Sequence, residues 1–119
     1  MSDTPSYERV TPRARVGTTG ISEEMDLQTG DGVWINPPDR VAAITVAVHI
    51  PEGETASYVI ETSCNLPSTI GDNGNGGYWD NVYNATLTEN AVIMLANAVT
   101  GIRVRCIAAS DHINVCFVG

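Results

Sequence analysis

Residues 101–118 read GIRVRCIAASDHINVCFV and carry the clearest fold signal of the chain. Apolar and polar side chains alternate along both halves of this stretch, which is the period of a β-strand with one buried face. A two-residue turn at Ser110 and Asp111 predicts a β-hairpin in which Cys106 lies opposite Val115. In that register one face of the hairpin is wholly apolar, and it consists of Ile102, Val104, Cys106, Ala108, Ile113, Val115 and Phe117.

The opposite face of this predicted hairpin carries Arg103 and Arg105 with no acidic residue between them. It also places Cys116 beside Arg105 while Cys106 points to the core, so a disulfide between these two cysteines is disfavoured. The arginines fit either a clamp for an acidic partner or a pair with Glu61 across the sheet. The second, intramolecular interpretation is favoured.

The chain from about Gly30 onward has the same texture of short apolar runs separated by turn residues. Strands at nearly regular spacing predict an all-β fold, an antiparallel β-sandwich of the jelly-roll or Ig-like type. Helical periodicity is weak, and at most residues 22–28 form a single helical turn. The predicted strands are residues 31–36, 41–49, 57–64, 82–88, 91–96, 101–109 and 112–118.

Residues 1–29 are predicted to form an extended N-terminal arm that precedes a β-sandwich domain of residues 30–119. This segment is polar, lacks periodicity and contains Arg9, Arg13 and Arg15. A basic arm on an acidic body suits docking on an acidic surface, and a merely solvated terminus fits the composition equally well. If the arm docks, removal of residues 1–20 should leave a folded sandwich that no longer binds its partner.

The composition of the whole chain narrows the class of function. Its 119 residues suit one domain, and 43% of them are hydrophobic. The formal charge is −8, from 14 acidic and 6 basic residues, and such a surface repels nucleic acid and anionic lipid. No apolar run approaches the roughly 20 residues of a membrane helix, and the N-terminus lacks the apolar block of a signal peptide. We therefore expect a soluble protein that is not secreted by the usual route and binds neither nucleic acid nor membranes.

The segment of residues 71–81, GDNGNGGYWDN, looks most like a binding motif. It fails the EF-hand pattern because Gly74 and Tyr83 stand where a calcium loop starting at Asp72 needs oxygen ligands. A dinucleotide fingerprint needs another glycine spacing, and a phosphate-binding P-loop needs a lysine, which the chain lacks. The favoured interpretation is an exposed loop between strands, with Trp79 packing down at its end. A carbohydrate-stacking platform made by Tyr78 and Trp79 is the alternative.

Neither metal nor catalytic chemistry is indicated by the cysteines and histidines. Cys64, Cys106 and Cys116 show no zinc-ligand spacing with His49 or His112. The Asp111–His112 pair is interpreted as turn chemistry, and no nucleophile is paired with a base and an orienting group. We expect no metal, no cofactor and no enzymatic activity.

The order of these segments resembles the small β-sandwich head decoration, or cement, proteins of tailed bacteriophages. The resemblance covers roughly residues 31–119 and rests on four segments in this order: GVWINP, TASYVIETSCN, YWDNV and a late IRVR strand followed by the terminal residues. The chain departs from the family in the loop before the tryptophan, which is longer and richer in glycine than the usual S-x-D-G-x-x-W.

The resemblance implies a non-enzymatic protein of the virion, made in the host bacterial cytoplasm and placed on the outer capsid surface. It implies binding to the major capsid protein and assembly as a homo-oligomer, a trimer in many such proteins. A head–tail adaptor, a tail component or a head-fibre component is an alternative within the virion, and a carbohydrate-binding module is an alternative from another class. The candidate partner-binding residues are Arg9, Arg13, Arg15, Tyr78 and Trp79.

Overall fold

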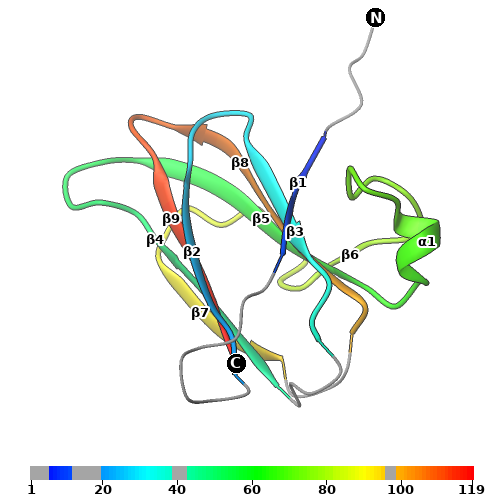
Figure 1. Cartoon of the computed structure of the whole chain (residues 1–119). Helices are drawn as coiled ribbons and strands as arrows, with labels where there is room; N and C mark the ends of the chain where they lie inside the picture. Colours follow the sequence, from blue (N-terminus) through cyan, green and yellow to red (C-terminus); the bar gives the residue numbers. More distant parts are fainter. Residues whose placement is uncertain (1–5, 12–19, 39–42, 96–98) are drawn as a thin grey trace, which may run out of the picture.

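The structure is a computed structural model that describes residues 6–11, 20–38, 43–95 and 99–119. It is all-β, with two sheets and one short helix, α1 (Pro67–Ile70) (Figure 1). The five-stranded sheet has the order β1 (Glu8–Val10), β3 (Gly32–Ile35), β8 (Gly101–Ala109), β5 (Ala56–Ser63) and β6 (Asp80–Asn81). The four-stranded sheet has the order β2 (Ser22–Leu27), β9 (Ile113–Val118), β4 (Ile44–His49) and β7 (Ala91–Leu95).

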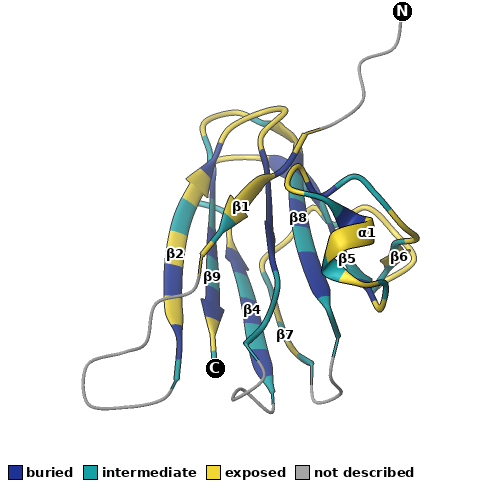
Figure 2. Ribbon diagram, turned by 45° about the vertical axis from the view of Figure 1, so that its right-hand side comes forward, coloured by how far each residue is buried: buried dark blue, intermediate teal, exposed yellow. Residues whose placement is uncertain are grey.

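The two sheets bury their facing sides against each other. Neighbouring strands are antiparallel except β1 and β3, which are parallel. Buried and more exposed residues alternate along β4 and β9, as expected for strands with one face in a core (Figure 2). The largest side chains of this core are Tyr58, Phe117, Ile21, Ile35, Ile60, Ile102 and Ile113. No helix among the described residues has the length and apolar character needed to cross a bilayer.

The predicted hairpin of β8 with β9 is wrong, although most of its apolar face is right. The strand β8 pairs with β3 and β5, whereas β9 pairs with β2 and β4 in the other sheet. The residues between the two strands therefore cross from one sheet to the other. Both arrangements bury alternate side chains of each strand, so the alternation could not distinguish them. As a consequence Cys116 and Arg105 lie on different sheets and are not neighbours.

One predicted core residue, Ala108, is exposed because of a β-bulge. The pairing of β5 with β8 shifts between Ser57 and Tyr58, so that Ser57 faces Ala108 and Tyr58 faces Cys106. The extra residue, Ile107, reverses the in-out alternation beyond this point and is itself 43% exposed. All three cysteines are unpaired thiols.

Two described parts of the predicted arm of residues 1–29 belong to the sheets. Glu8–Val10 is a strand that pairs with β3, and Ser22–Leu27 pairs with β9 along its whole length. The predicted helical turn at residues 22–28 is therefore also wrong. The sequence SEEMDL has weak strand preference by itself, and the pairing with β9 decides its conformation.

Residues 82–88, predicted as a strand, form turns instead. Only Leu87 makes a bridge, with Tyr58. The Asn81 side chain accepts a hydrogen bond from the Tyr83 N–H at 3.0 Å and donates one to the Ala85 carbonyl at 3.2 Å. Such local side-chain bonds offer the backbone an alternative to a ladder.

Candidate functional site

The long excursion between β5 and β6 is the candidate site, and we call residues 66–79 the loop lobe. It contains α1 and lies beside the five-stranded sheet, away from the four-stranded sheet (Figure 1). The helix starts at Pro67, whose fixed φ suits a first helical position, and it ends after one turn at Gly71, where φ is +79°. Positive φ is a conformation that glycine adopts without strain.

A row of directly opposed residues crosses the outer face of the five-stranded sheet under the loop lobe. Its members, taken from β1 to β6, are Arg9, Trp34, Arg103, Glu61 and Asn81. Trp34 is fully buried although it points away from the main core, because the loop lobe covers it. The row therefore forms the floor on which the lobe rests.

Arg103 is the centre of this arrangement. Its guanidinium lies between two aromatic rings, 4.5 Å from the Tyr7 centroid and 4.3 Å from the Trp79 centroid. Its Nε donates to Glu61 Oε1 at 2.8 Å, and its Nη1 donates to the Gly74 carbonyl at 2.8 Å. This confirms the intramolecular pairing of Arg103 with Glu61 that the sequence predicted.

The other arginine of β8 has a different environment. Arg105 lies between Gly32 of β3 and Val59 of β5 on the same outer face. Its Nε is buried and has no hydrogen-bond partner among the residues that the structure describes. Of the two arginines, Arg103 thus has its Nε paired with Glu61, whereas the Nε of Arg105 has no partner among the described residues.

A second small core joins the loop lobe to the sheet. It consists of Tyr7, Trp34 and Ile70, with Trp79 packed against it. Two glycines permit the close approach: a Cβ on Gly32 would lie 2.5 Å from Tyr7 Cδ1, and one on Gly74 would lie 2.7 Å from Trp34 Cδ1. At least part of the glycine content of the loop thus serves packing.

The polar backbone groups of the loop lobe are largely used internally. The carbonyls of Asp72, Asn73 and Gly74 accept hydrogen bonds from the Trp34 indole, the Tyr7 N–H and Arg103 respectively. The N–H groups of three further lobe positions also donate within the lobe or to its base, and these belong to Asn75, Gly76 and Tyr78. These six backbone groups are therefore already engaged and are less suited to bind a cation or a phosphate.

The predicted pair Tyr78 and Trp79 has side chains that point in different directions. The Trp79 ring packs inward on Arg103, and its Nε1 donates to the Gly76 carbonyl at 3.0 Å, so the expected packing of this residue is confirmed. Tyr78 instead points outward and is 84% exposed. A stacking platform that uses both rings is therefore not present.

The predicted arginines have different outcomes. Arg9 lies over the Trp34 ring at 5.1 Å from its centroid, and its Nη1 is 3.7 Å from Asp72 Oδ1. It is thus next to the loop lobe, on the same side of the molecule as Tyr78. Arg13 and Arg15 lie outside the described residues.

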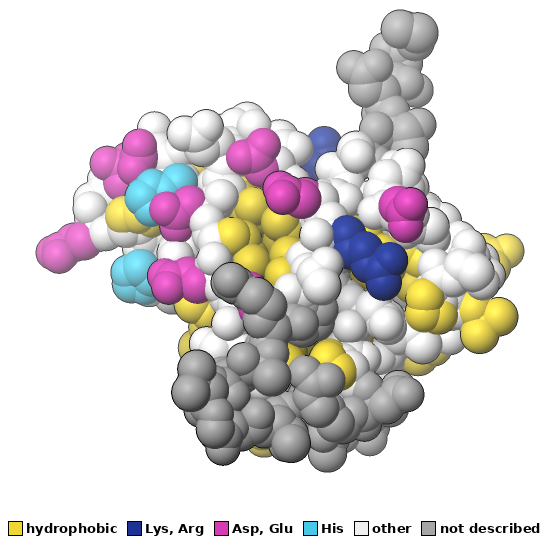
Figure 3. All heavy atoms as spheres, in the orientation of Figure 1, with side chains coloured by type: hydrophobic (Ala, Val, Ile, Leu, Met, Phe, Trp, Pro, Cys, Tyr) yellow, Lys and Arg dark blue, Asp and Glu magenta, His cyan; other side chains and the backbone are white. Residues whose placement is uncertain are grey.

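The sequence did not single out Leu66, which is 68% exposed at the start of α1. The neighbouring Asn65 accepts a hydrogen bond from the Tyr78 N–H at 2.5 Å through Oδ1, so Leu66 and Tyr78 belong to backbone segments that lie near each other. Figure 3 shows apolar side chains on the surface at this side of the molecule. The available signal was the Leu-Pro step, an apolar residue at a helix start where polar caps are common.

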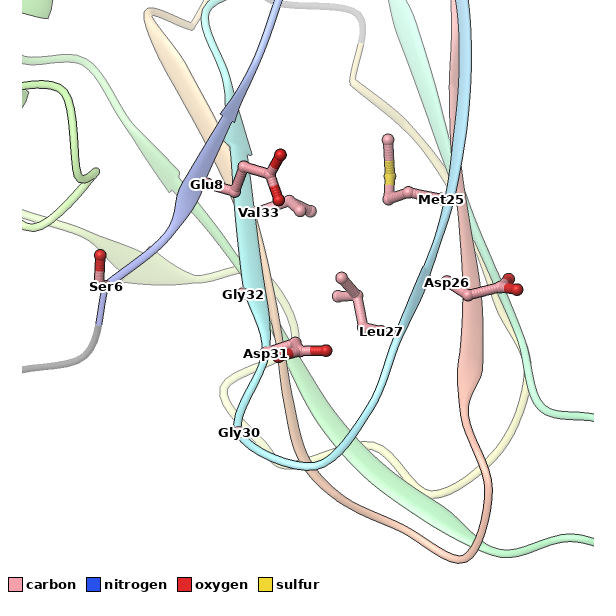
Figure 4. Close-up of a pocket in the computed structure, with 9 residues that line it drawn as sticks. All are labelled: Ser6, Glu8, Met25, Asp26, Leu27, Gly30, Asp31, Gly32 and Val33. Atoms are coloured by element: carbon pink, nitrogen blue, oxygen red, sulfur yellow. The ribbon is translucent and has the colours of Figure 1, made fainter.

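A separate hollow of about 350 Å³ opens between the edges of the two sheets, at β1 and β3 on one side and β2 on the other (Figure 4). Val33 and Leu27 form part of its wall, and the carboxylates of Glu8 and Asp31 face it. The carboxylates make this hollow unfavourable for anionic ligands.

The thiol of Cys106 lies in the core. Burial, with a smaller contribution from Asp31, raises the pKa of this thiol.

The two histidines lie among acidic side chains at the surface (Figure 3). His112 Nδ1 is 2.6 Å from Asp111 Oδ2 in the turn after β8, which agrees with the interpretation of this pair as turn chemistry. His49 Nδ1 is 3.1 Å from Asn90 Nδ2. In the described ranges of the chain, no group of three or more histidine, cysteine, aspartate or glutamate residues could hold a metal ion.

Comparison of the chain with models of protein families, with curated proteins and with solved structures finds no match.

Proposed function

We propose that the protein is a structural protein of a bacteriophage virion, a decoration or cement protein that binds the major capsid protein on the outer shell and stabilises it. The observation that carries the proposal is the exposure of Leu66 and Tyr78 on a loop lobe that is hydrogen-bonded to the sheet. Large apolar side chains that stand out from a fixed backbone are typical of anchors in protein–protein contacts.

The rigidity of the loop lobe supports attachment in particular. An interface loop that is already ordered loses little conformational entropy on binding, so more of its contact energy appears as affinity. Trp34, Tyr7 and Arg103 hold the lobe backbone through hydrogen bonds of 2.8 to 2.9 Å. These hydrogen bonds hold the lobe backbone in place, while the side chains of Leu66 and Tyr78 stay exposed and can contact a partner.

The strand order supports a jelly-roll over an Ig-like sandwich, and this finer assignment is part of the proposal. In Ig-like domains several hairpins join consecutive strands of one sheet. Here β5 and β6 are the only described strands that are consecutive in sequence and paired. Every other connection from β2 to β9 changes sheet. Jelly rolls recur in viral capsid and lectin domains, so this fold is compatible with a binding function. The kind of partner has to be inferred from the surface residues, because one fold serves many functions.

A carbohydrate partner is less well supported than a protein partner. Sugar rings stack on exposed aromatic faces, and the Trp79 ring already packs against Arg103. Tyr78 alone offers a small platform. Leu66 beside it suits an apolar protein surface better than a polar sugar.

Co-sedimentation with purified capsids of the encoding phage tests the proposal. The double variant Leu66→Ser, Tyr78→Ser should bind at least about 30-fold more weakly, the loss expected when anchor residues are removed. Ile107→Ser is the matched control, because Ile107 is a 43% exposed apolar residue outside the loop lobe. Circular dichroism and thermal melting establish that the variants are folded.

Equal binding by the double variant and the control would contradict the proposal, as would a native protein that stays in the supernatant. Electron microscopy of bound particles then separates the shell from the head–tail junction, tail or head fibre. Tryptophan fluorescence titrated with oligosaccharides covers the carbohydrate alternative. Deletion of residues 1–20 is not a clean test, because it removes Tyr7 from the second core.

A further inference from the structure

The edge strands of the two sheets differ in how they resist pairing with another chain. In the described part of the molecule the edges are β1, β6, β2 and β7. The strands β1 and β6 have three and two residues, and β2 carries Glu23, Glu24 and Asp26. Short strands and charged residues are the usual protection of a sheet edge. Only β7, AVIML, has five residues without a charge or a proline.

The outer face of β7 is also apolar and exposed. Val92 is 72% exposed and Met94 is 68% exposed. They lie opposite Ala47 and Thr45 of β4, so the surface next to them is uncharged as well. An uncovered apolar edge with open backbone groups is a template for a further strand.

The geometry of β7 suits a second copy of the chain as the added strand. Two copies of β7 related by a two-fold axis through Ile93 pair in antiparallel fashion over all five residues. Val92 then lies opposite the second copy's Met94, and Ala91 lies opposite its Leu95. In this register the exposed residues of one β7 lie opposite the exposed residues of the other. The core-facing residues likewise lie opposite each other, so the core-facing side of one sheet continues into the core-facing side of the second.

A hollow in the surface lies beside β7, where a paired second copy would lie. The hollow has a volume of about 430 Å³ and adjoins the N-terminal end of the strand. Its apolar lining comes from Tyr83, Leu87, Ala91 and Val92, and its polar lining from Thr88, Glu89 and Asn90. In the two-fold register Met94 and Leu95 of the second copy lie opposite the two β7 residues of this lining. The two-fold axis makes this contact twice. Met94 and Leu95 of each copy lie beside the hollow of the other copy.

Charge adds a further reason for pairing at this edge. Each copy has a formal charge of −8, so two copies repel each other over most of their surfaces. Residues 91–102 contain no charged side chain, so contact along β7 brings no like charges directly together. We propose that the protein self-associates through β7 into a two-fold dimer with one continuous eight-stranded sheet.

Sedimentation equilibrium of the isolated protein over a range of concentrations tests the dimer independently of any capsid. We expect a dimer mass for the native chain. In the Val92→Lys, Met94→Lys variant, the dissociation constant should rise by at least about tenfold, because lysine on an edge opposes strand addition. Ile107→Lys is the control, since Ile107 is an exposed apolar residue on β8 of the other sheet.

A cysteine experiment tests the register, in a Cys64→Ser background that removes the exposed native thiol. Mild oxidation of a mixture of Val92→Cys and Met94→Cys chains should give a covalent heterodimer, because directly opposed residues have Cβ atoms about 5 Å apart. The Val92→Cys chain alone should cross-link poorly, because its two cysteines would be diagonal neighbours about 7–8 Å apart.

Three results would overturn the proposal. The first is a native protein that remains a monomer at every concentration. The second is a dimer, or the trimer implied by the phage resemblance, whose mass is unchanged in the lysine variant. The third is cross-linking of Val92→Cys with itself as fast as with Met94→Cys, which would exclude this register even if the lysine variant did not fold.

Discussion

Replacement of Arg103 by methionine removes the group that joins the loop lobe to the sheet. The change deletes the 2.8 Å contact with Glu61, the 2.8 Å hydrogen bond to the Gly74 carbonyl and the stacking between Tyr7 and Trp79. Methionine retains an unbranched apolar stem, so the volume lost is small and the change is mainly one of charge and hydrogen bonding.

The structure sets the magnitude of this effect. The side chains of Arg103 and Glu61 are only 13% and 19% exposed, so the pair is largely shielded from solvent. Removal of one partner of a buried pair costs about 3–5 kcal/mol, because the other charge stays behind unpaired. We expect the free energy of unfolding to fall by about 3 kcal/mol, toward the lower end because some solvent reaches both groups.

Urea unfolding followed by tryptophan fluorescence and by far-ultraviolet circular dichroism measures this loss. Trp34 and Trp79 both lie at the loop lobe, so fluorescence reports the lobe and circular dichroism reports the sheets. In R103M the fluorescence transition should come at lower urea than the dichroism transition. Loss of the lobe before the sheets is the expected sign of a local unfolding unit.

A double-mutant cycle with Glu61→Gln supplies the control. The two changes should be non-additive by about 2 kcal/mol if the pair acts as a unit. Arg103→Lys keeps the charge without the flat fork and should lose less than R103M, which keeps the cycle measurable if R103M does not fold. A free energy for R103M within about 0.5 kcal/mol of the native value would refute this account of the lobe.

Two further predictions concern other parts of the structure. Gly76→Ala should lower the free energy of unfolding by about 1–3 kcal/mol in a urea titration, because the added Cβ would clash with the Thr69 carbonyl oxygen; an unchanged midpoint would contradict the packing described. Burial, with a smaller contribution from Tyr83, raises the pKa of Tyr58 to about 12, and its hydroxyl donates to the Glu89 carbonyl at 2.5 Å. The unfolded chain loses this proton near pH 10 while the folded chain keeps it, so the contribution of Tyr58 to stability should be constant below pH 10 and fall as the pH rises from 10 toward 12. Ultraviolet titration should show one late tyrosine that disappears in Tyr58→Phe, and a variant with the same titration curve as the native protein would disprove this assignment.

The sequence predicted the strands that have alternating apolar residues and failed where the partner decides the conformation. The strands β4, β5, β8 and β9 lie at the predicted places because alternation of apolar and more polar residues specifies a half-buried strand. The strands β3 and β7, which are short apolar runs without such alternation, also lie where they were predicted. The same alternation contains no information about which sheet a strand joins, so the pairing of β8 with β9 was wrong. The acidic β2 could not be recognised, because its strand conformation comes from β9, about 90 residues further along the chain.

The candidate site was predicted in part for a related reason. The loop was recognised from its glycines and asparagines, and Trp79 was expected to pack inward because an indole rarely stays exposed. The residues that contact Arg103 include Tyr7, Glu61 and Gly74, which come from distant parts of the chain. No local sequence pattern predicts that they lie together. Leu66 was missed because a single apolar residue in a loop is common on protein surfaces.

The pairing of β2 with β9 has a consequence during synthesis on the ribosome. Ser22 meets Val118, so the nascent β2 finds no strand to pair with until nearly a hundred further residues have been translated. At about 5–20 residues per second, this delay lasts on the order of 5–20 seconds. Throughout that interval the apolar side chains of Ile21 and Leu27 are open to chaperones, and the fold closes only when β9 emerges to sit between β2 and β4.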